Sequence, residues 1–204
     1  TSEQEATEFI DSIRARHNDA THNCIAYRIR EPRIERFSDD GEPSGTAGMP
    51  MLEVLKKEDI YKTAIAVQEL SNSKTGALIV IQQDEPLENY ENTGDAIDAA
   101  VNSRLIENIF FKNSPLHDGA MIISSHRIKA AGCILPVAHN QDIPKELGLR
   151  HRAALGMSQN SDAIVVIVSE ETGGISVAIN GKFQLLLSAE KLESILTEEL
   201  RNEK

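Results

Sequence analysis

The hydrophobic pattern divides the chain into two parts that meet near residue 57. Apolar residues at helical spacing predict a helix over 3–16, and alternation predicts a strand over 23–30. Residues 37–50 are rich in Gly, Pro, Ser and Asp, which is typical of turns, and a short helix is predicted over 51–57. We therefore expect a small α+β amino-terminal segment, 1–57, and a larger domain, 58–204.

The larger domain has the pattern of an α/β fold. Short continuous apolar runs and alternating runs predict strands over 76–81, 119–124, 129–135, 163–168, 175–179 and 183–187. Asn180-Gly181 between the last two strands predicts a tight hairpin. Helical spacing predicts helices over 60–71, 96–110, 150–158 and from 188 onward. The expected fold is a mixed central β-sheet flanked by helices.

Composition and charge narrow the class of function. The 204-residue chain is 40% hydrophobic and carries a net charge of −11, so it lacks the surplus of Lys and Arg that general binding to DNA or RNA needs. Cys24 and Cys133 are far apart and lack the spacing of metal ligands. Since the sequence contains neither a membrane-length apolar run nor a signal peptide, we expect a cytoplasmic protein with reduced thiols.

A carboxylate stands beside a glycine where an apolar strand begins, at Asp118-Gly119. Asp-Gly is a common turn dipeptide, so Asp118 can be a turn residue. A carboxylate at a strand edge can also hold Mg²⁺ or Mn²⁺, or take a proton from a hydroxyl. His117 is a neighbouring candidate metal ligand, and Pro115 stiffens the approach to the carboxylate. These neighbours favour a functional role.

Two guanidiniums and an imidazole, Arg150, His151 and Arg152, begin a predicted helix. A solvated basic face is the usual explanation of such a charge cluster. Here the helix-start N–H groups, the helix dipole and the forked guanidiniums all favour an anion, and the rest of the chain is acidic. We therefore interpret the triplet as a phosphate-binding cluster.

A third candidate, residues 169–174, follows the apolar strand 163–168. Ligands of α/β sheets collect at the carboxyl ends of strands, where Ser169 and Glu170 can contact phosphate or a metal. A hairpin turn with solvated acids explains the same residues equally well. Thr93-Gly94 alone is typical of a turn.

Together these residues resemble the diadenylate cyclase (DAC) domain family. The matching stretches lie in the family's order between about residues 60 and 200, at 75–80, 113–120, 150–156 and 168–174. The resemblance implies condensation of two ATP into cyclic di-AMP, a bacterial second messenger, and two pyrophosphates, with Mg²⁺ or Mn²⁺. Because the product is symmetric, two subunits are expected to face each other, each presenting one ATP.

The resemblance also implies roles for individual residues. Asp118 would help to activate the ribose 3′-hydroxyl for attack on the partner ATP's α-phosphate. The residues implied in catalysis are Asp118, Gly119, Arg150, His151 and Arg152. Those implied in nucleotide binding are Gly76, Thr93, Gly94, Ala120, Leu135, Ser169 and Glu170. The implied metal ligands are His117, Asp118 and Glu170.

Two positions depart from the family's pattern. Leu149 stands where many members have Thr, which removes a hydroxyl near the phosphates, and Ile134 stands where related chains often have Tyr. We expect altered nucleotide affinity with activity retained. A catalytically silent nucleotide-binding module is the alternative function, which Leu149 supports and Asp118 opposes.

The amino-terminal segment resembles a different family. Residues 17–24 and 36–48 are similar to the amino-terminal domain of YigZ/IMPACT proteins, and this match is expected to end near Leu55. A fragment this short buries little core by itself. It either packs on the cyclase domain, acts as a regulatory extension, or reflects an unusual fusion. A translation-linked binding function for this segment is opposed by the chain's acidic charge and the short match.

Overall fold

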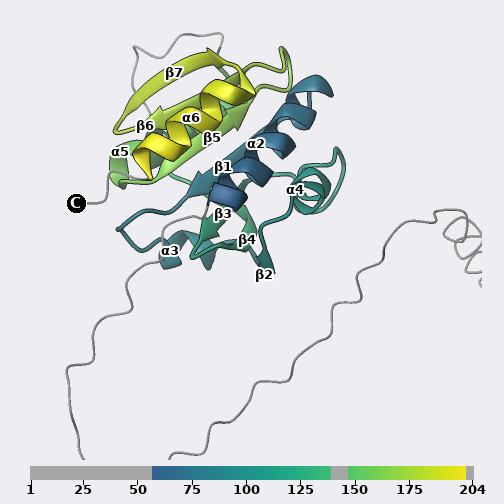
Figure 1. Ribbon diagram of the computed structural model, residues 1–204. Coiled ribbons are helices and arrows are strands. Elements are labelled where there is room, and N and C mark those ends of the chain that lie inside the picture. The colour runs from purple at the N-terminus through teal and green to yellow at the C-terminus, as the bar shows by residue number, and fades with distance from the viewer. Residues whose placement is uncertain (1–56, 139–146, 201–204) are drawn as a thin grey trace, which may run out of the picture. The chain divides into compact units, whose positions relative to one another are not determined.

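The computed structural model describes residues 57–138 and 147–200, which form a seven-stranded mixed sheet with helices on both faces (Figure 1). The strands are β1 Ala77–Ile81, β2 Asp95–Ala100, β3 Ala120–Ser124, β4 Arg127–Cys133, β5 Ile164–Val168, β6 Ile175–Ile179 and β7 Lys182–Leu187. The helices are α2 Lys57–Asn72, α3 Glu88–Glu91, α4 Ser103–Ile109, α5 Leu149–Asn160 and α6 Ala189–Glu199. The expected mixed sheet with flanking helices is confirmed. The elements expected before residue 57 lie outside the described residues.

The sheet order is β2-β4-β3-β1-β5-β6-β7. The central strand β1 pairs parallel with β3 and antiparallel with β5, so the amino ends of β1 and β3 lie at the same edge as the carboxyl end of β5. The segments just outside these three strand ends, which lie far apart in the sequence, are therefore brought together. This edge carries the candidate site.

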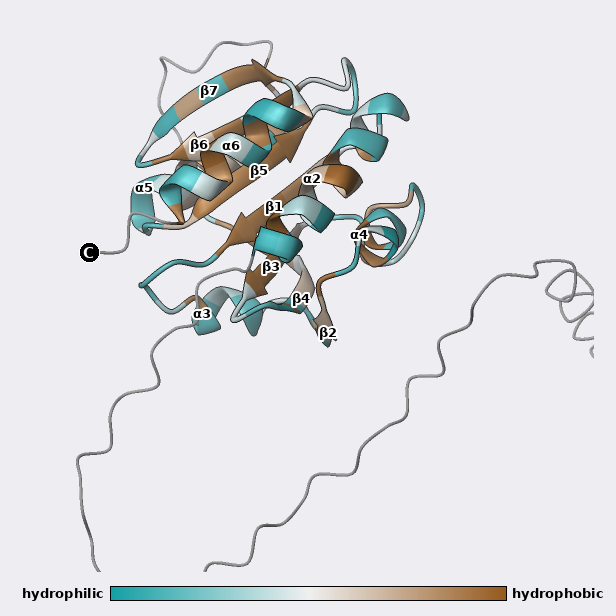
Figure 2. Cartoon of the chain, in the orientation of Figure 1, coloured by the Kyte–Doolittle hydropathy of each residue, from teal (hydrophilic) through white to brown (hydrophobic). Residues whose placement is uncertain are grey.

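Alternating side chains of the central strands build two hydrophobic cores. Ala77, Ile79 and Ile81 of β1 join the core beneath α2, α4 and α6, whereas Leu78 and Val80 join the core beneath α5. All five are at most 3% exposed. Figure 2 shows the central strands as a hydrophobic layer between more polar helices. Burial on both faces explains why these strands are continuous apolar runs in the sequence.

The helix predicted over 96–110 is wrong in its first half. Residues Asp95–Ala100 form the edge strand β2, which pairs antiparallel with β4 with a register shift between Ala96 and Ala99. The helix α4 begins only at Ser103, where the Asn102 side chain accepts a hydrogen bond from the Leu105 N–H at 3.3 Å. Alanine and aspartate do not favour strands, so pairing with β4 overrides the local preference. The strand β4 also begins two residues earlier than expected, and α3 was not expected.

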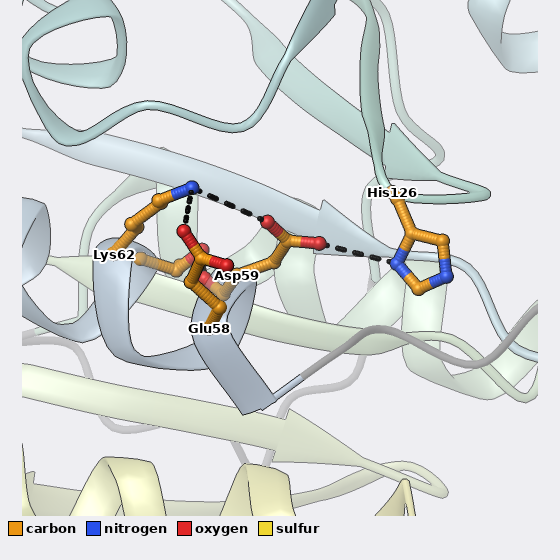
Figure 3. Close-up of polar contacts among 5 residues, drawn as sticks. Glu58, Asp59, Lys62 and His126 are labelled. Carbon is orange, nitrogen blue, oxygen red and sulfur yellow. Dashed lines mark hydrogen bonds and ion pairs between the residues drawn. The ribbon is translucent and has the colours of Figure 1, made fainter.

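A polar cluster ties the first turn of α2 to the turn between β3 and β4 (Figure 3). Asp59 Oδ2 lies 3.1 Å from His126 Nδ1, and Lys62 Nζ lies 2.8 Å from Glu58 Oε1 and 3.9 Å from Asp59 Oδ1. Asp59 is only 8% exposed, so its carboxylate needs these polar partners. The cluster therefore anchors the start of α2 to the turn between β3 and β4.

Among residues 57–138 and 147–200, none of the helices combines the length and the hydropathy of a membrane-spanning segment.

Candidate active site

A cavity of about 380 Å³ opens at the sheet edge where β1 and β3 begin and β5 ends. Ligands of parallel sheets usually bind at the carboxyl ends of the strands. Of these three strands only β5 ends at this edge, so that rule explains only part of the site's position. The start of α5 forms the opposite wall. The lining residues are Leu78, Asp118, Gly119, Val137, Gly148, Leu149, Arg150, His151, Ala153, Val168, Ser169, Glu170 and Glu171.

The cavity gathers six of the residues to which the sequence assigned a role in catalysis or binding. They come from three separate motifs and are Asp118, Gly119, Arg150, His151, Ser169 and Glu170. Seven other candidates do not line it, namely Gly76, Thr93, Gly94, His117, Ala120, Leu135 and Arg152. Sequence reasoning assigned no individual role to Leu78, Val137, Ala153 or Glu171. Of these, Glu171 carried a signal, because it belongs to the candidate segment 169–174.

The glycine after Asp118 is required by packing of the chain on β4. Gly119 has a φ of 114°, a conformation that other residues adopt only with strain. A Cβ at this position would lie 2.7 Å from the carbonyl carbon of Gly132 and 2.9 Å from the Cys133 oxygen. The backbone therefore approaches β4 closely, and this approach sets the position of Asp118 at the cavity wall.

Arg150 projects from the first turn of α5 and pairs with Glu170. Its Nη1 donates to Glu170 Oε2 at 2.8 Å, and the side chains are 24% and 64% exposed, respectively. Gly76 lies beneath this pair: a Cβ there would be 2.8 Å from Arg150 Nη1 and 3.0 Å from Glu170 Oε2. Gly76 therefore contributes space for the ion pair although it does not line the cavity.

The three residues of the basic triplet have different environments. His151 is 6% exposed, and its ring lies edge-on to Phe183 of β7 with centroids 6.0 Å apart. Burial lowers the pKa of His151, so its imidazole is neutral at pH 7 and adds no positive charge to the cavity. Arg152 does not line the cavity, so Arg150 is the member of the triplet that brings a positive charge to it. A phosphate-binding role for the whole triplet stays a prediction.

One expected metal ligand, His117, and several expected nucleoside contacts lie outside the cavity lining. His117 Nδ1 lies 2.5 Å from the Ser114 carbonyl oxygen and outside the cavity lining. Among the described residues, no three His, Cys, Asp or Glu side chains converge closely enough to hold a metal ion by themselves. Thr93 Oγ1 accepts a hydrogen bond from the Ile134 N–H at 2.8 Å, which places Thr93-Gly94 against the end of β4.

The chain belongs to the DAC family of nucleotide-binding domains. Residues 64–183, more than half of the chain, match the family model described as DisA bacterial checkpoint controller nucleotide-binding. Residues 1–70 match the Impact N-terminal domain. The second match runs beyond Leu55, where it was expected to end, and overlaps the first within α2.

Several characterised proteins are similar to this chain. The cyclic di-AMP synthase CdaA of Bacillus subtilis is 41% identical over 165 residues, which are 81% of this chain and 58% of CdaA. The diadenylate cyclase CdaS of Bacillus thuringiensis is 47% identical over 116 residues, 57% of this chain and 58% of CdaS. The chain thus spans less than two thirds of the length of these relatives.

The fold and the amino-terminal segment each have a separate relative. The crystal structure of DacA from Staphylococcus aureus, a double mutant, matches with a TM-score of 0.69 and 44% identity, covering 71% of this chain and 96% of that chain. The IMPACT family member YvyE of Bacillus subtilis is 53% identical over 79 residues, 38% of this chain and 36% of YvyE.

Proposed function

We propose that the chain is a diadenylate cyclase that condenses two ATP into cyclic di-AMP and two pyrophosphates. The observation that carries this proposal is the meeting of Asp118, Arg150 and Glu170, from three separate motifs, in one cavity of about 380 Å³. This volume lies within the usual range for small-molecule sites. The names of the relatives CdaA and CdaS support the same reaction.

The proposed reaction joins the ribose 3′-oxygen of one ATP to the α-phosphorus of the other. The bond between the α-phosphorus and the bridging oxygen breaks, pyrophosphate leaves, and the hydroxyl proton passes to the Asp118 carboxylate. The ribose 3′-oxygen of the second nucleotide then attacks the α-phosphorus of the first in the same way, which releases the second pyrophosphate and closes the ring. Arg150 and the N–H groups at the start of α5 stabilise negative charge on the phosphates. Positioning and charge therefore do most of the work, as in phosphoryl transfer generally.

The oxygen donors of the cavity fit a divalent cation such as Mg²⁺ or Mn²⁺. Magnesium is commonly held by one or two protein carboxylates together with phosphate oxygens of the substrate, so Asp118 and Glu170, which both line the cavity, would be its protein ligands. Such an ion would supply positive charge to the departing pyrophosphate. His117 is not part of the proposed ligand set, because its ring nitrogen contacts the Ser114 carbonyl outside the cavity.

The reaction requires two copies of the chain, since each contributes one ATP to a symmetric product. The apolar side chains of Val137 and Leu149 at the cavity are 40% and 78% exposed, and a facing copy would cover them. We propose that the cyclase domain spans 58–204 and acts as a face-to-face pair. The segment 1–57 is proposed as a separate regulatory extension.

The direct test is to incubate the purified chain with ATP and Mn²⁺ and to identify the nucleotide products by mass. We expect cyclic di-AMP from the wild type and none from Asp118→Asn, which should still bind ATP. A variant Asp118→Asn with the wild-type rate would remove this carboxylate from the mechanism. ATP that binds without conversion would favour a silent nucleotide-binding module, unless deletion of residues 1–57 restores product formation.

A further inference from the structure

The ion pair between Arg150 and Glu170 lies where the proposed function requires a guanidinium to meet phosphate. Arg150 Nη1 donates to Glu170 Oε2 at 2.8 Å, and both side chains line the cavity. Arg150 is mostly enclosed, at 24% exposed, whereas Glu170 is 64% exposed and accessible to ions from solvent. The more accessible partner is therefore the carboxylate.

This pair opposes the binding of a polyphosphate in two ways. The Glu170 carboxylate neutralises the guanidinium that would attract the phosphates, and its negative charge also repels them. A divalent cation on Glu170 reverses both effects, because the carboxylate then holds the cation and the guanidinium is available to the anion. Carboxylate oxygen is a ligand that Mg²⁺ and Mn²⁺ prefer.

The surroundings allow the guanidinium to remain in the cavity in either pairing. Gly76 lies directly beneath the pair, and a Cβ there would lie 2.9 Å from Arg150 Cζ, inside normal contact. Arg150 also stands at the amino-terminal turn of α5, where backbone N–H groups without a partner inside the helix favour the same anion. A change of partner therefore requires side-chain movement but no rearrangement of the sheet.

We propose that Arg150 exchanges partners during ATP binding. It pairs with Glu170 in the nucleotide-free site and with the triphosphate in the occupied site, and a divalent cation bound by Glu170 drives the exchange. This inference rests on the proposed function. Its consequence is coupling: the cation raises the affinity for ATP, and ATP raises the affinity for the cation by the same factor.

The test measures binding of 3′-deoxy-ATP, which lacks the attacking hydroxyl and cannot react. Its dissociation constant is determined by calorimetry with Mn²⁺ and, separately, with EDTA. The proteins are the wild type, Glu170→Gln, Arg150→Ala and the double variant. Glu171→Gln is the matched control, because Glu171 lines the same cavity and does not pair with Arg150. Circular dichroism establishes that each variant is folded.

Without metal, we expect Glu170→Gln to bind the analogue about fivefold more tightly than the wild type, the upper end for a partly exposed ion pair. The gain in affinity caused by Mn²⁺ should shrink by at least the same factor. In the Arg150→Ala background, the metal-free gain from Glu170→Gln should shrink, because only the repulsion between the Glu170 carboxylate and the phosphates is then relieved. Glu171→Gln should change the metal-free affinity less than about twofold, since it leaves the ion pair intact.

Two results would overturn the exchange. One is a metal-free affinity of Glu170→Gln equal to that of the wild type while the wild type still makes cyclic di-AMP from ATP; then only the exchange fails. The other is an equal gain in Glu171→Gln, which would indicate general repulsion. A wild type that neither binds the analogue nor makes cyclic di-AMP would refute the proposed function, and the exchange with it.

Discussion

Replacing Gly156 by alanine tests how closely helix α5 packs beside the candidate site. A Cβ on Gly156 would lie 2.2 Å from the Pro136 carbonyl oxygen and 2.8 Å from the Ala138 nitrogen. Both are backbone atoms, so neither can rotate away as a side chain would. Ordinary contacts at a Cβ begin near 3.4 Å, so the helix and the segment 136–138 must separate by about an ångström.

Two effects of opposite sign decide the stability of Gly156→Ala. Alanine is favoured over glycine inside a helix by about 1 kcal/mol. Overpacking costs about 1–3 kcal/mol and more when the obstacle is backbone. Because the required movement is large, we expect the steric cost to win, with a net loss of about 1–2 kcal/mol in the free energy of unfolding.

The same substitution should weaken nucleotide binding. The Ala138 N–H donates to the Arg152 carbonyl oxygen at 3.0 Å, and Val137 lines the cavity beside the start of α5. Displacing α5 from this segment therefore moves Arg150 relative to the opposite wall. Calorimetric titration with ATP should show a larger dissociation constant for Gly156→Ala than for the wild type.

Urea unfolding followed by circular dichroism measures the stability effect. Gly148→Ala is the matched control, since a Cβ at Gly148 has no atom within 4 Å. We expect this control to lie within about 1 kcal/mol of the wild type, the ordinary cost of alanine at a helix N-cap. A Gly156→Ala protein at least as stable as the wild type, with unchanged ATP affinity, would refute the reasoning.

Two further predictions concern buried titratable groups. Burial lowers the pKa of His151, so the contribution of its neutral ring to stability is complete above the unfolded-state pKa of about 6.5. This contribution is lost as the pH falls through the folded-state pKa, and stability then changes by at most about 1.4 kcal/mol per pH unit. Urea midpoints between about pH 5 and 7 should depend less on pH in His151→Gln; an equal dependence would contradict a neutral, buried ring. Burial raises the pKa of Cys133 to about 11, so in a Cys24→Ser protein maleimide should label the native thiol far more slowly at neutral pH than the urea-unfolded one. Equal rates would show that Cys133 is accessible.

Local sequence determined the elements whose residues carry their own conformational signal. Asn180 and Gly181 have φ values of 49° and 70°, as a tight hairpin between β6 and β7 requires. Ser188 caps α6 by accepting a hydrogen bond from the Lys191 N–H at 3.2 Å. The central strands could be recognised because residues buried on both faces must be apolar throughout.

The motifs also predicted most of the polar cavity wall. Asp118, Arg150, Ser169 and Glu170 were singled out from their positions beside strands or at a helix start, and all four line the cavity. Their neighbours in sequence carried that signal. The sequence alone could not show how the motifs face one another, because they lie on segments brought together by pairing of β1 with β3 and β5 and by packing of α5 on the sheet.

Tertiary contacts decided the features that local patterns left open or misjudged. The segment Asp95–Ala100 became a strand because β4 supplies its hydrogen-bonding partner. The pKa of His151 is lowered because packing against Phe183 and the core excludes water from its ring. Arg150 pairs with Glu170, and both side chains lie against Gly76. The residues next to Gly76 in the sequence do not show that this position must lack a side chain. Each outcome depends on residues distant in sequence, so the sequence determined which groups are present and the folded chain decided their partners and charge.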